Sequence, residues 1–177
     1  MNIETIAVIG AGQDGREIAC AALRAGYRTV LEDVSDSRLE QAVAWIASVN
    51  AYEGSRLTLA RTVEVAVREA DLIIEAVAEE VEMKIEMFTI FDKFAKPDAI
   101  FASSSRLVPI ADLAAATFCP GRCIGMRFVS ATGHGDAIEL VRTPRTSEET
   151  VATCREVFRR MSKEIRIVVE RECTESR

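Results

Sequence analysis

The feature that most constrains this chain is a short apolar run followed directly by closely spaced glycines. The run is Ile6-Ala7-Val8-Ile9, and Gly10, Gly12 and Gly15 follow it in a GxGxxG pattern. Apolar spacing predicts a helix from about Asp14 to Ala25. A strand, a glycine turn and a helix in this order indicate the opening β-α unit of a doubly wound α/β fold.

Each glycine has a physical task in such a unit. Gly10 would allow the tight turn, Gly12 would let a pyrophosphate approach the backbone, and Gly15 would let the helix pack close to the strand. Gln13 and Asp14 open the helix, whose free N–H groups and partial positive charge favour phosphates. The alternative is that the three glycines serve only a tight turn.

An acidic residue stands where a dinucleotide site needs one. Asp33 ends the second predicted strand, 18 residues after Gly15. A carboxylate there accepts hydrogen bonds from the adenosine ribose hydroxyls and repels a 2′-phosphate. We therefore expect the cofactor to be NAD rather than NADP.

Short apolar runs alternate with helical patterns along the rest of the chain. Two capping boxes are predicted, one from Ser37 with Glu40 and one from Thr146 with Glu149. Strands are expected near 29–31, 57–59, 72–77, 99–102, 124–128, 137–141 and 165–169. Helices are expected near 38–49, 63–69, 110–115 and 147–161, and another with Val81, Ile85, Phe88 and Phe91 on one apolar face.

This alternation predicts an α/β fold, a doubly wound and mostly parallel sheet of the Rossmann-like kind, with helices on both faces. We expect a single dinucleotide-binding domain over residues 1–170. A polar tail is expected over 171–177. No internal repeat or linker divides the chain.

Composition excludes several function classes. The chain has 177 residues, 49% of them hydrophobic, and a net charge of −6. An acidic domain is a poor nucleic-acid or anionic-membrane binder. No apolar stretch approaches the roughly 20 residues of a membrane span, and the first residues lack the pattern of a secretory signal. A soluble, cytoplasmic protein is expected.

The cysteines and the histidine argue against a metal site. Five cysteines at irregular spacing read as reduced thiols that act as small core residues. A zinc site needs four ligands, and His134 is the only histidine. We expect no metal.

From Ile6 to about Val169 the chain resembles the NAD-binding domain of the 3-hydroxyacyl-CoA dehydrogenase family. The similarity rests on residues 7–15 (AVIGAGQDG), 71–79 (DLIIEAVAE) with Lys84 after them, 100–103 (IFAS), 124–128 (IGMRF) and 138–141 (IELV). It implies that Ala76, Val77, Glu79, Lys84 and Ser104 contact the cofactor. For Glu79 and Lys84 the alternative is a solvated pair at a helix N-terminus.

The resemblance also locates the family's catalytic positions. Its catalytic glutamate falls on Glu139, its proton-accepting histidine on Arg127, and its active serine on Arg106. An arginine stays protonated at neutral pH and cannot act as a base. His134 lies seven residues after Arg127, too far along the chain to be a simple substitute. The family's helical C-terminal domain, which supplies dimer contacts and covers the acyl-CoA, is expected to be absent.

Two functions remain open from the sequence. In the first, an NAD-binding domain acts without ordinary dehydrogenase activity, and the arginines pair with Glu139. In the second, Arg106 and Arg127 hold an anionic 3-hydroxy substrate such as an acyl-CoA, and a partner chain supplies the missing half. In either case we expect a second copy or a partner chain to cover the C-terminal edge of the sheet.

Overall fold

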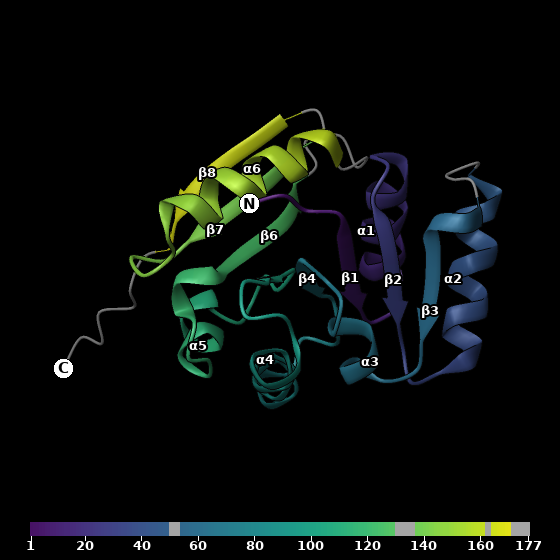
Figure 1. Cartoon of the computed structure of the whole chain (residues 1–177), viewed down its shortest axis with the longest axis horizontal. Helices are drawn as coiled ribbons and strands as arrows, with labels where there is room; N and C mark the ends of the chain where they lie inside the picture. Colours follow the sequence, from purple (N-terminus) through teal and green to yellow (C-terminus); the bar gives the residue numbers. More distant parts are fainter. Residues whose placement is uncertain (50–53, 130–136, 162–163, 171–177) are drawn as a thin grey trace.

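The computed structural model describes residues 1–49, 54–129, 137–161 and 164–170 (Figure 1). The expected tail at 171–177 and His134 lie outside the described residues. One sheet contains eight strands in the order β3-β2-β1-β4-β5-β6-β7-β8. Their bounds are β1 Thr5–Ile9, β2 Arg28–Glu32, β3 Leu57–Ala60, β4 Leu72–Glu75, β5 Ile100–Ser103, β6 Cys123–Val129, β7 Ala137–Arg142 and β8 Glu164–Val169.

The sheet confirms the predicted doubly wound architecture. Neighbouring strands from β3 to β6 are parallel, β6 and β7 are antiparallel, and β7 and β8 are parallel again. The strand order reverses beside β1, which lies between β2 and β4. In an open α/β sheet, the carboxyl ends of the strands at this reversal form the binding crevice.

Within the described residues, six α-helices cover the two faces of the sheet (Figure 1). They are α1 Gln13–Arg24, α2 Asp36–Ser48, α3 Val63–Val67, α4 Val81–Phe94, α5 Ile110–Ala115 and α6 Glu148–Met161, with short 3-10 turns at Gly54–Arg56 and Pro120–Arg122. Residues of α1, α2 and α6 form one apolar core, and residues of α3, α4 and α5 form the other. Both faces of the central strands β1, β4 and β5 are therefore buried, as continuous apolar strands require.

The caps of two helices differ from the predicted capping boxes. The Ser35 hydroxyl, rather than that of Ser37, accepts from the Arg38 amide at the start of α2. Ser37 lies within the helix, where its hydroxyl accepts from Gln41. At α6 the Ser147 hydroxyl accepts from the Thr150 amide.

Thr146 has a different partner from the expected cap. Its hydroxyl accepts from the Thr143 amide and donates to the carbonyl of Cys123. Thr146 therefore fastens the turn between β7 and α6 to the start of β6. The neighbouring Ser147 hydroxyl caps α6 instead.

The buried face of α4 also differs from the predicted apolar stripe. Phe88 and Phe91 are fully buried, as expected, whereas Val81 is 45% exposed. Lys84 is fully buried instead. A charged side chain occupies this core position because a carboxylate of β4 lies beside it, as described below.

Helices α1 and α2 meet through a cation–π contact. The guanidinium carbon of Arg16 lies 4.9 Å from the centroid of the Trp45 ring. Arg16 lies in the first turn of α1, and its amide donates to the carbonyl of Gly12. The contact therefore connects the glycine loop to α2.

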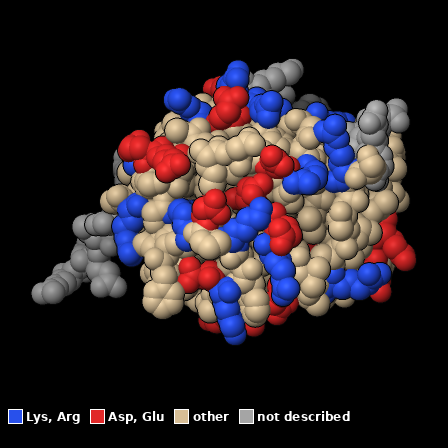
Figure 2. All heavy atoms as spheres, viewed as in Figure 1, with Lys and Arg blue, Asp and Glu red and all other residues tan. Residues whose placement is uncertain are grey.

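The charged side chains of one face and the described thiols bear on the expected partners and metal. On the face seen in Figure 2, basic and acidic side chains are interspersed. No described helix is long and apolar enough to cross a membrane. Cys20, Cys123 and Cys154 are buried free thiols, and no described cluster of three or more His, Cys, Asp or Glu side chains is arranged to hold a metal.

Candidate functional site

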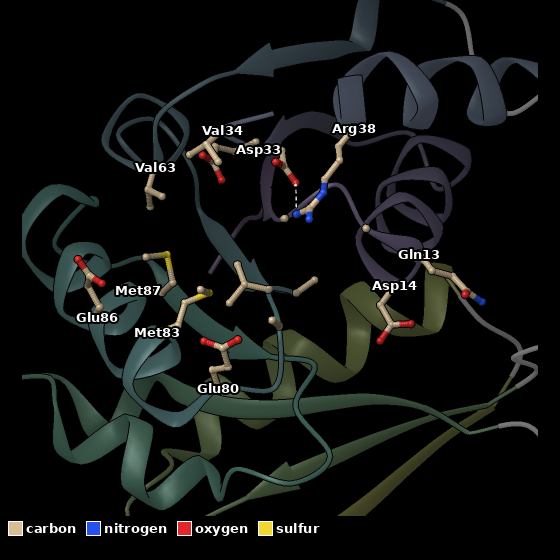
Figure 3. Close-up of a pocket in the computed structure, with 16 residues that line it drawn as sticks. Gln13, Asp14, Asp33, Val34, Arg38, Val63, Glu80, Met83, Glu86 and Met87 are labelled. Carbon is tan, nitrogen blue, oxygen red and sulfur yellow. Dashed lines mark ion pairs between the residues drawn. The ribbon is translucent and has the colours of Figure 1, made fainter. Parts of the chain in front are cut away.

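A pocket of about 860 Å³ lies at the carboxyl ends of β1, β2 and β4. Its walls come from the glycine loop, from the turns after β2 and β4, and from α3 and α4 (Figure 3). The lining residues are Gly10, Gly12, Gln13, Asp14, Glu32, Asp33, Val34, Arg38, Val63, Ala76, Val77, Ala78, Glu80, Met83, Glu86 and Met87. The pocket thus occupies the crevice that the reversal of strand order predicts.

Two glycines of the loop are required by the protein itself. Gly10 has φ +100°, and a Cβ there would lie 2.7 Å from the Ala76 carbonyl oxygen. A Cβ on Gly15 would lie 1.7 Å from the Gly10 carbonyl oxygen. Both distances are impossible for real atoms, so these glycines let α1 and the turn after β4 approach the loop.

Gly12 differs from the other two. A Cβ at this position would meet no protein atom within 4 Å, and its φ of −66° suits any residue. The fold therefore gives no reason for a glycine here. Space kept open at the N-terminus of a helix suits a pyrophosphate, because the first N–H groups of the helix are unpaired. The alternative that all three glycines serve only a turn does not account for Gly12.

Asp33 lies beside the glycine loop with its carboxylate well fixed. The Ala11 amide donates to Oδ2 at 3.0 Å, and the Ser35 amide donates to Oδ1 at 2.9 Å. The Arg38 guanidinium lies 3.7 Å from Oδ2 (Figure 3). Each carboxylate oxygen has two lone pairs, so Asp33 keeps acceptor capacity for ribose hydroxyls.

The remaining predicted cofactor residues divide into two groups. Gln13, Asp14, Ala76 and Val77 line the pocket. Gly15, Glu79, Lys84 and Ser104 are not among its lining residues. Gly15 acts through backbone packing, and the other three belong to a polar network next to the pocket.

That network begins with a buried ion pair. Nζ of Lys84 lies 2.7 Å from Oε1 of Glu75, and both side chains are fully buried. Lys84 also donates to the carbonyl of Val77 at 3.2 Å. The Ser103 hydroxyl donates to the other carboxylate oxygen of Glu75 at 2.6 Å. These bonds fix the turn after β4 that forms one wall of the pocket.

Glu79 carries the network into the loop after β5. Its carboxylate accepts from the Ser105 hydroxyl at 2.7 Å and from the Arg106 amide at 2.8 Å, and Lys84 lies 3.7 Å away. Burial acts to raise the pKa of Glu79, but these hydrogen bonds and the Lys84 charge together hold that pKa below its usual value. Glu79 is therefore ionised at neutral pH and fixes this loop. Ser104 lies in the same loop, with its amide donating to the carbonyl of Glu75.

Comparisons with known proteins identify the family. The family model for "3-hydroxyacyl-CoA dehydrogenase, NAD binding domain" matches residues 5–173. The chain belongs to this family. Its described fold is the family's NAD-binding domain, and its cofactor is NAD.

Individual relatives give the same result. The 3-hydroxybutyryl-CoA dehydrogenase of Bradyrhizobium diazoefficiens is 33% identical over 178 residues, which cover 93% of this chain and 61% of that protein. Human mitochondrial hydroxyacyl-coenzyme A dehydrogenase is 29% identical, covering 84% of this chain and 53% of that protein. The crystal structure of a Ralstonia eutropha (S)-3-hydroxybutyryl-CoA dehydrogenase superposes with a TM-score of 0.87 at 26% identity, covering 96% and 65%. The chain thus spans less than two thirds of the length of these relatives.

The positions expected to carry the chemistry of the 3-hydroxyacyl-CoA dehydrogenase family lie close together. Arg127 on β6 and Glu139 on β7 are directly paired in register, with Nη1 4.0 Å from Oε2. Nε of Arg127 donates to the Ser105 carbonyl at 2.8 Å. The exposed side chain of Arg106 reaches the carbonyl of Phe128 at 3.5 Å. The fold therefore gathers Arg106, Arg127 and Glu139 at one end of the polar network.

Sequence reasoning missed part of the pocket of this NAD-binding domain. Val63, Met83 and Met87 form an apolar wall on α3 and α4 (Figure 3). In the sequence, Met83 and Met87 are four residues apart, beside the predicted core face of α4. This spacing is the only sequence signal of the apolar wall. Glu32 was also missed, since it precedes Asp33 in a strand that reads as core.

Proposed function

We propose that this chain binds NAD(H) and does not oxidise 3-hydroxyacyl-CoA by the base-catalysed route of its family. The observation that supports this is Arg127 at the position that the family resemblance gives to the proton-accepting histidine. Its guanidinium donates to Ser105 and faces Glu139. A guanidinium keeps its proton at any physiological pH, so it cannot take one from a hydroxyl.

The missing base has a large kinetic cost. General-base help is typically worth 10² to 10⁴ in rate. We therefore propose that the domain retains cofactor binding as its function, in sensing or assembly.

The test combines a binding assay with a turnover assay on the same preparation. Calorimetry should detect NADH binding, while NAD with a short 3-hydroxyacyl-CoA should yield no NADH absorbance. An active dehydrogenase of the family serves as the control for the assay. Clear NADH production by the unmodified chain would overturn the proposal.

A second candidate function is supported by Arg106. Its exposed side chain reaches the same strand that carries Arg127, so two guanidinium groups share the mouth of this network. Such a pair suits an anionic substrate, such as a carboxylate or phosphate. Under this alternative, NADH-loaded protein should bind an acyl-CoA, and Arg106→Gln should weaken that binding. Turnover would then require a proton acceptor other than Arg127.

The exposed edge of the sheet supports the proposed partner. β8 is the last strand in the sheet order and pairs only with β7 among the described strands. Ile167, Val168 and Val169 are 44%, 38% and 60% exposed. Apolar, unpaired strand edges favour pairing with another chain. We propose that a second copy or a partner chain covers β8, and a monodisperse monomer at high concentration with no partner in pull-downs would contradict this.

A further inference from the structure

Glu32 is a buried carboxyl group that the site described so far does not use. It is the last residue of β2, paired in register with Ile9 of β1 and Ala60 of β3. Its side chain is only 3% exposed, yet it lines the pocket. Among the described residues, its Oε1 atom has no hydrogen-bond partner. A buried polar atom that lines a pocket without a partner indicates a ligand contact.

The charges around Glu32 make its ionised form unfavourable. Burial has the largest effect, followed by the neighbouring carboxylates of Asp33 and Glu64, and the Gly10 amide opposes them in part. Together they raise the pKa of Glu32 to about 7. Other charged groups that line the same pocket are Asp14 of α1, Arg38 of α2, Glu80 at the N-cap of α4, and Glu86 of α4. Arg38 is the only cation in that lining, and it lies against Asp33.

The position of Glu32 indicates which part of NAD it would meet. The glycine loop suits the pyrophosphate, and Asp33 suits the adenosine ribose. Glu32 and the apolar side chains of Val63, Met83 and Met87 also line this pocket. A flat base suits such apolar groups, and its polar edge can then turn toward the buried carboxyl group of Glu32.

We propose that Glu32 binds the adenine base of NAD as a neutral carboxylic acid. A neutral acid presents one O–H donor and one carbonyl acceptor, as a glutamine amide presents one N–H and one carbonyl. Adenine offers the complementary pair, an amino donor beside a ring-nitrogen acceptor, and amide side chains bind it in this bidentate way. The proposal rests on NAD binding and adds a group that responds to pH.

The first test measures NAD affinity against pH by calorimetry. Between about pH 6 and about pH 8.5 the affinity of the unmodified chain should fall about thirtyfold, because binding then requires proton uptake by a group with a pKa of about 7. Calorimetry in buffers of different ionisation enthalpy should show that uptake directly, with no variant needed. Adenosine diphosphate ribose, which keeps the adenine but lacks the nicotinamide, should show the same dependence.

Matched variants assign the effect to Glu32. Glu32→Gln should bind NAD at pH 8.5 nearly as tightly as the unmodified chain does at pH 6, with little pH dependence. Glu86→Gln removes another pocket carboxylate, and His134→Gln removes the chain's only histidine. Both should keep the slope of the unmodified chain. Thermal unfolding checks that each variant is folded.

A change of base tests the contact with adenine. At the N6–N7 edge, where amide side chains bind adenine, nicotinamide hypoxanthine dinucleotide carries an oxygen in place of the amino group and therefore offers two acceptors. A neutral acid has one donor, so the unmodified chain should bind this analogue about tenfold more weakly than NAD. Equal affinity for the two dinucleotides would overturn the contact with adenine.

The measurements distinguish a failure of the Glu32 proposal from a failure of the cofactor assignment. NAD binding that is flat with pH, or a Glu32→Gln variant that retains the full pH slope, would overturn the role of Glu32 while leaving NAD binding intact. Absence of NAD binding by the unmodified chain at every pH would overturn the cofactor assignment itself, and the Glu32 proposal with it.

Discussion

Lys84 of α4 and Glu75 of β4 form an ion pair with 2.7 Å between Nζ and Oε1, and neither side chain reaches solvent. Glu75 also accepts hydrogen bonds from the Val77 amide and the Ser103 hydroxyl. Lys84, which the family resemblance places at the cofactor, is therefore a cation that stabilises the fold. It joins α4 to the centre of the sheet and sets the turn that borders the pocket.

Loss of one partner of this pair should be costly. We predict that Lys84→Met lowers the free energy of unfolding by about 3–5 kcal/mol, because Glu75 is left charged and buried. Adding Glu75→Gln should recover part of that loss, since the neutral amide needs no cation. Urea denaturation of the two variants measures both effects. A cost below about 1 kcal/mol for Lys84→Met would contradict the structural role.

The glycine loop should separate binding from stability. Gly12→Ala places a methyl group in open space, so we predict unchanged or slightly raised thermal stability with NAD affinity reduced at least about tenfold. Gly15→Ala serves as the contrast, because its Cβ would collide with the Gly10 carbonyl. It should destabilise the fold strongly. Full NAD affinity in folded Gly12→Ala would argue against a pyrophosphate at this loop.

Asp33 should decide between NAD and NADP. Asp33→Asn keeps an acceptor oxygen but removes the negative charge, so we predict that NADP gains about tenfold in affinity relative to NAD. Asp36→Asn is the matched control, because Asp36 is exposed, pairs with Arg61 and is not a lining residue of the pocket. Competition titrations of the two dinucleotides give the ratio, and an unchanged ratio in Asp33→Asn would remove Asp33 as the discriminating group.

Glu32 should make stability depend on pH. Its pKa is raised to about 7 in the folded chain, so the folded state binds the proton more tightly than the unfolded state. The contribution of Glu32 to stability is therefore fully present below the ordinary glutamate pKa of about 4.3 and is lost as pH rises toward about 7.

The matched variant isolates this contribution. Glu32→Gln cannot ionise, so its stability relative to the unmodified chain should increase by about 3 kcal/mol between about pH 5 and about pH 8. Chemical denaturation at both pH values measures the difference. A constant difference would mean that Glu32 has an ordinary pKa.

The sequence predicted the fold well because strand and helix periods are strong signals here. Each of the eight strands contains a predicted apolar run, and even the weakly apolar residues 57–59 lie within β3. Gly10, Gly12 and Asp33, which the sequence predicts at a cofactor site, line one side of the pocket. These features are local in sequence, so a pattern over a few residues is enough to reveal them.

The features that sequence missed depend on contacts between distant segments. Lys84 reads as a surface residue, and only the carboxylate of Glu75 from β4 makes its burial tolerable. Glu32 reads as one residue of a strand, and only the positions of α3 and α4 show that its side chain lines a pocket. The cap of α2 shifted to Ser35 for a similar reason, since the tight turn after Asp33 sets where the helix begins.

The contact between Arg16 and Trp45 makes the pocket visible to spectroscopy. Trp45 is the only tryptophan of the chain, so all of its indole fluorescence arises at this one place on α2. The cation above the ring belongs to the first turn of α1, the turn that begins at Gly12. A ligand bound at that turn therefore contacts the same turn whose arginine lies over the chain's one tryptophan. Occupancy of the dinucleotide site can thus be followed by light emission without any label.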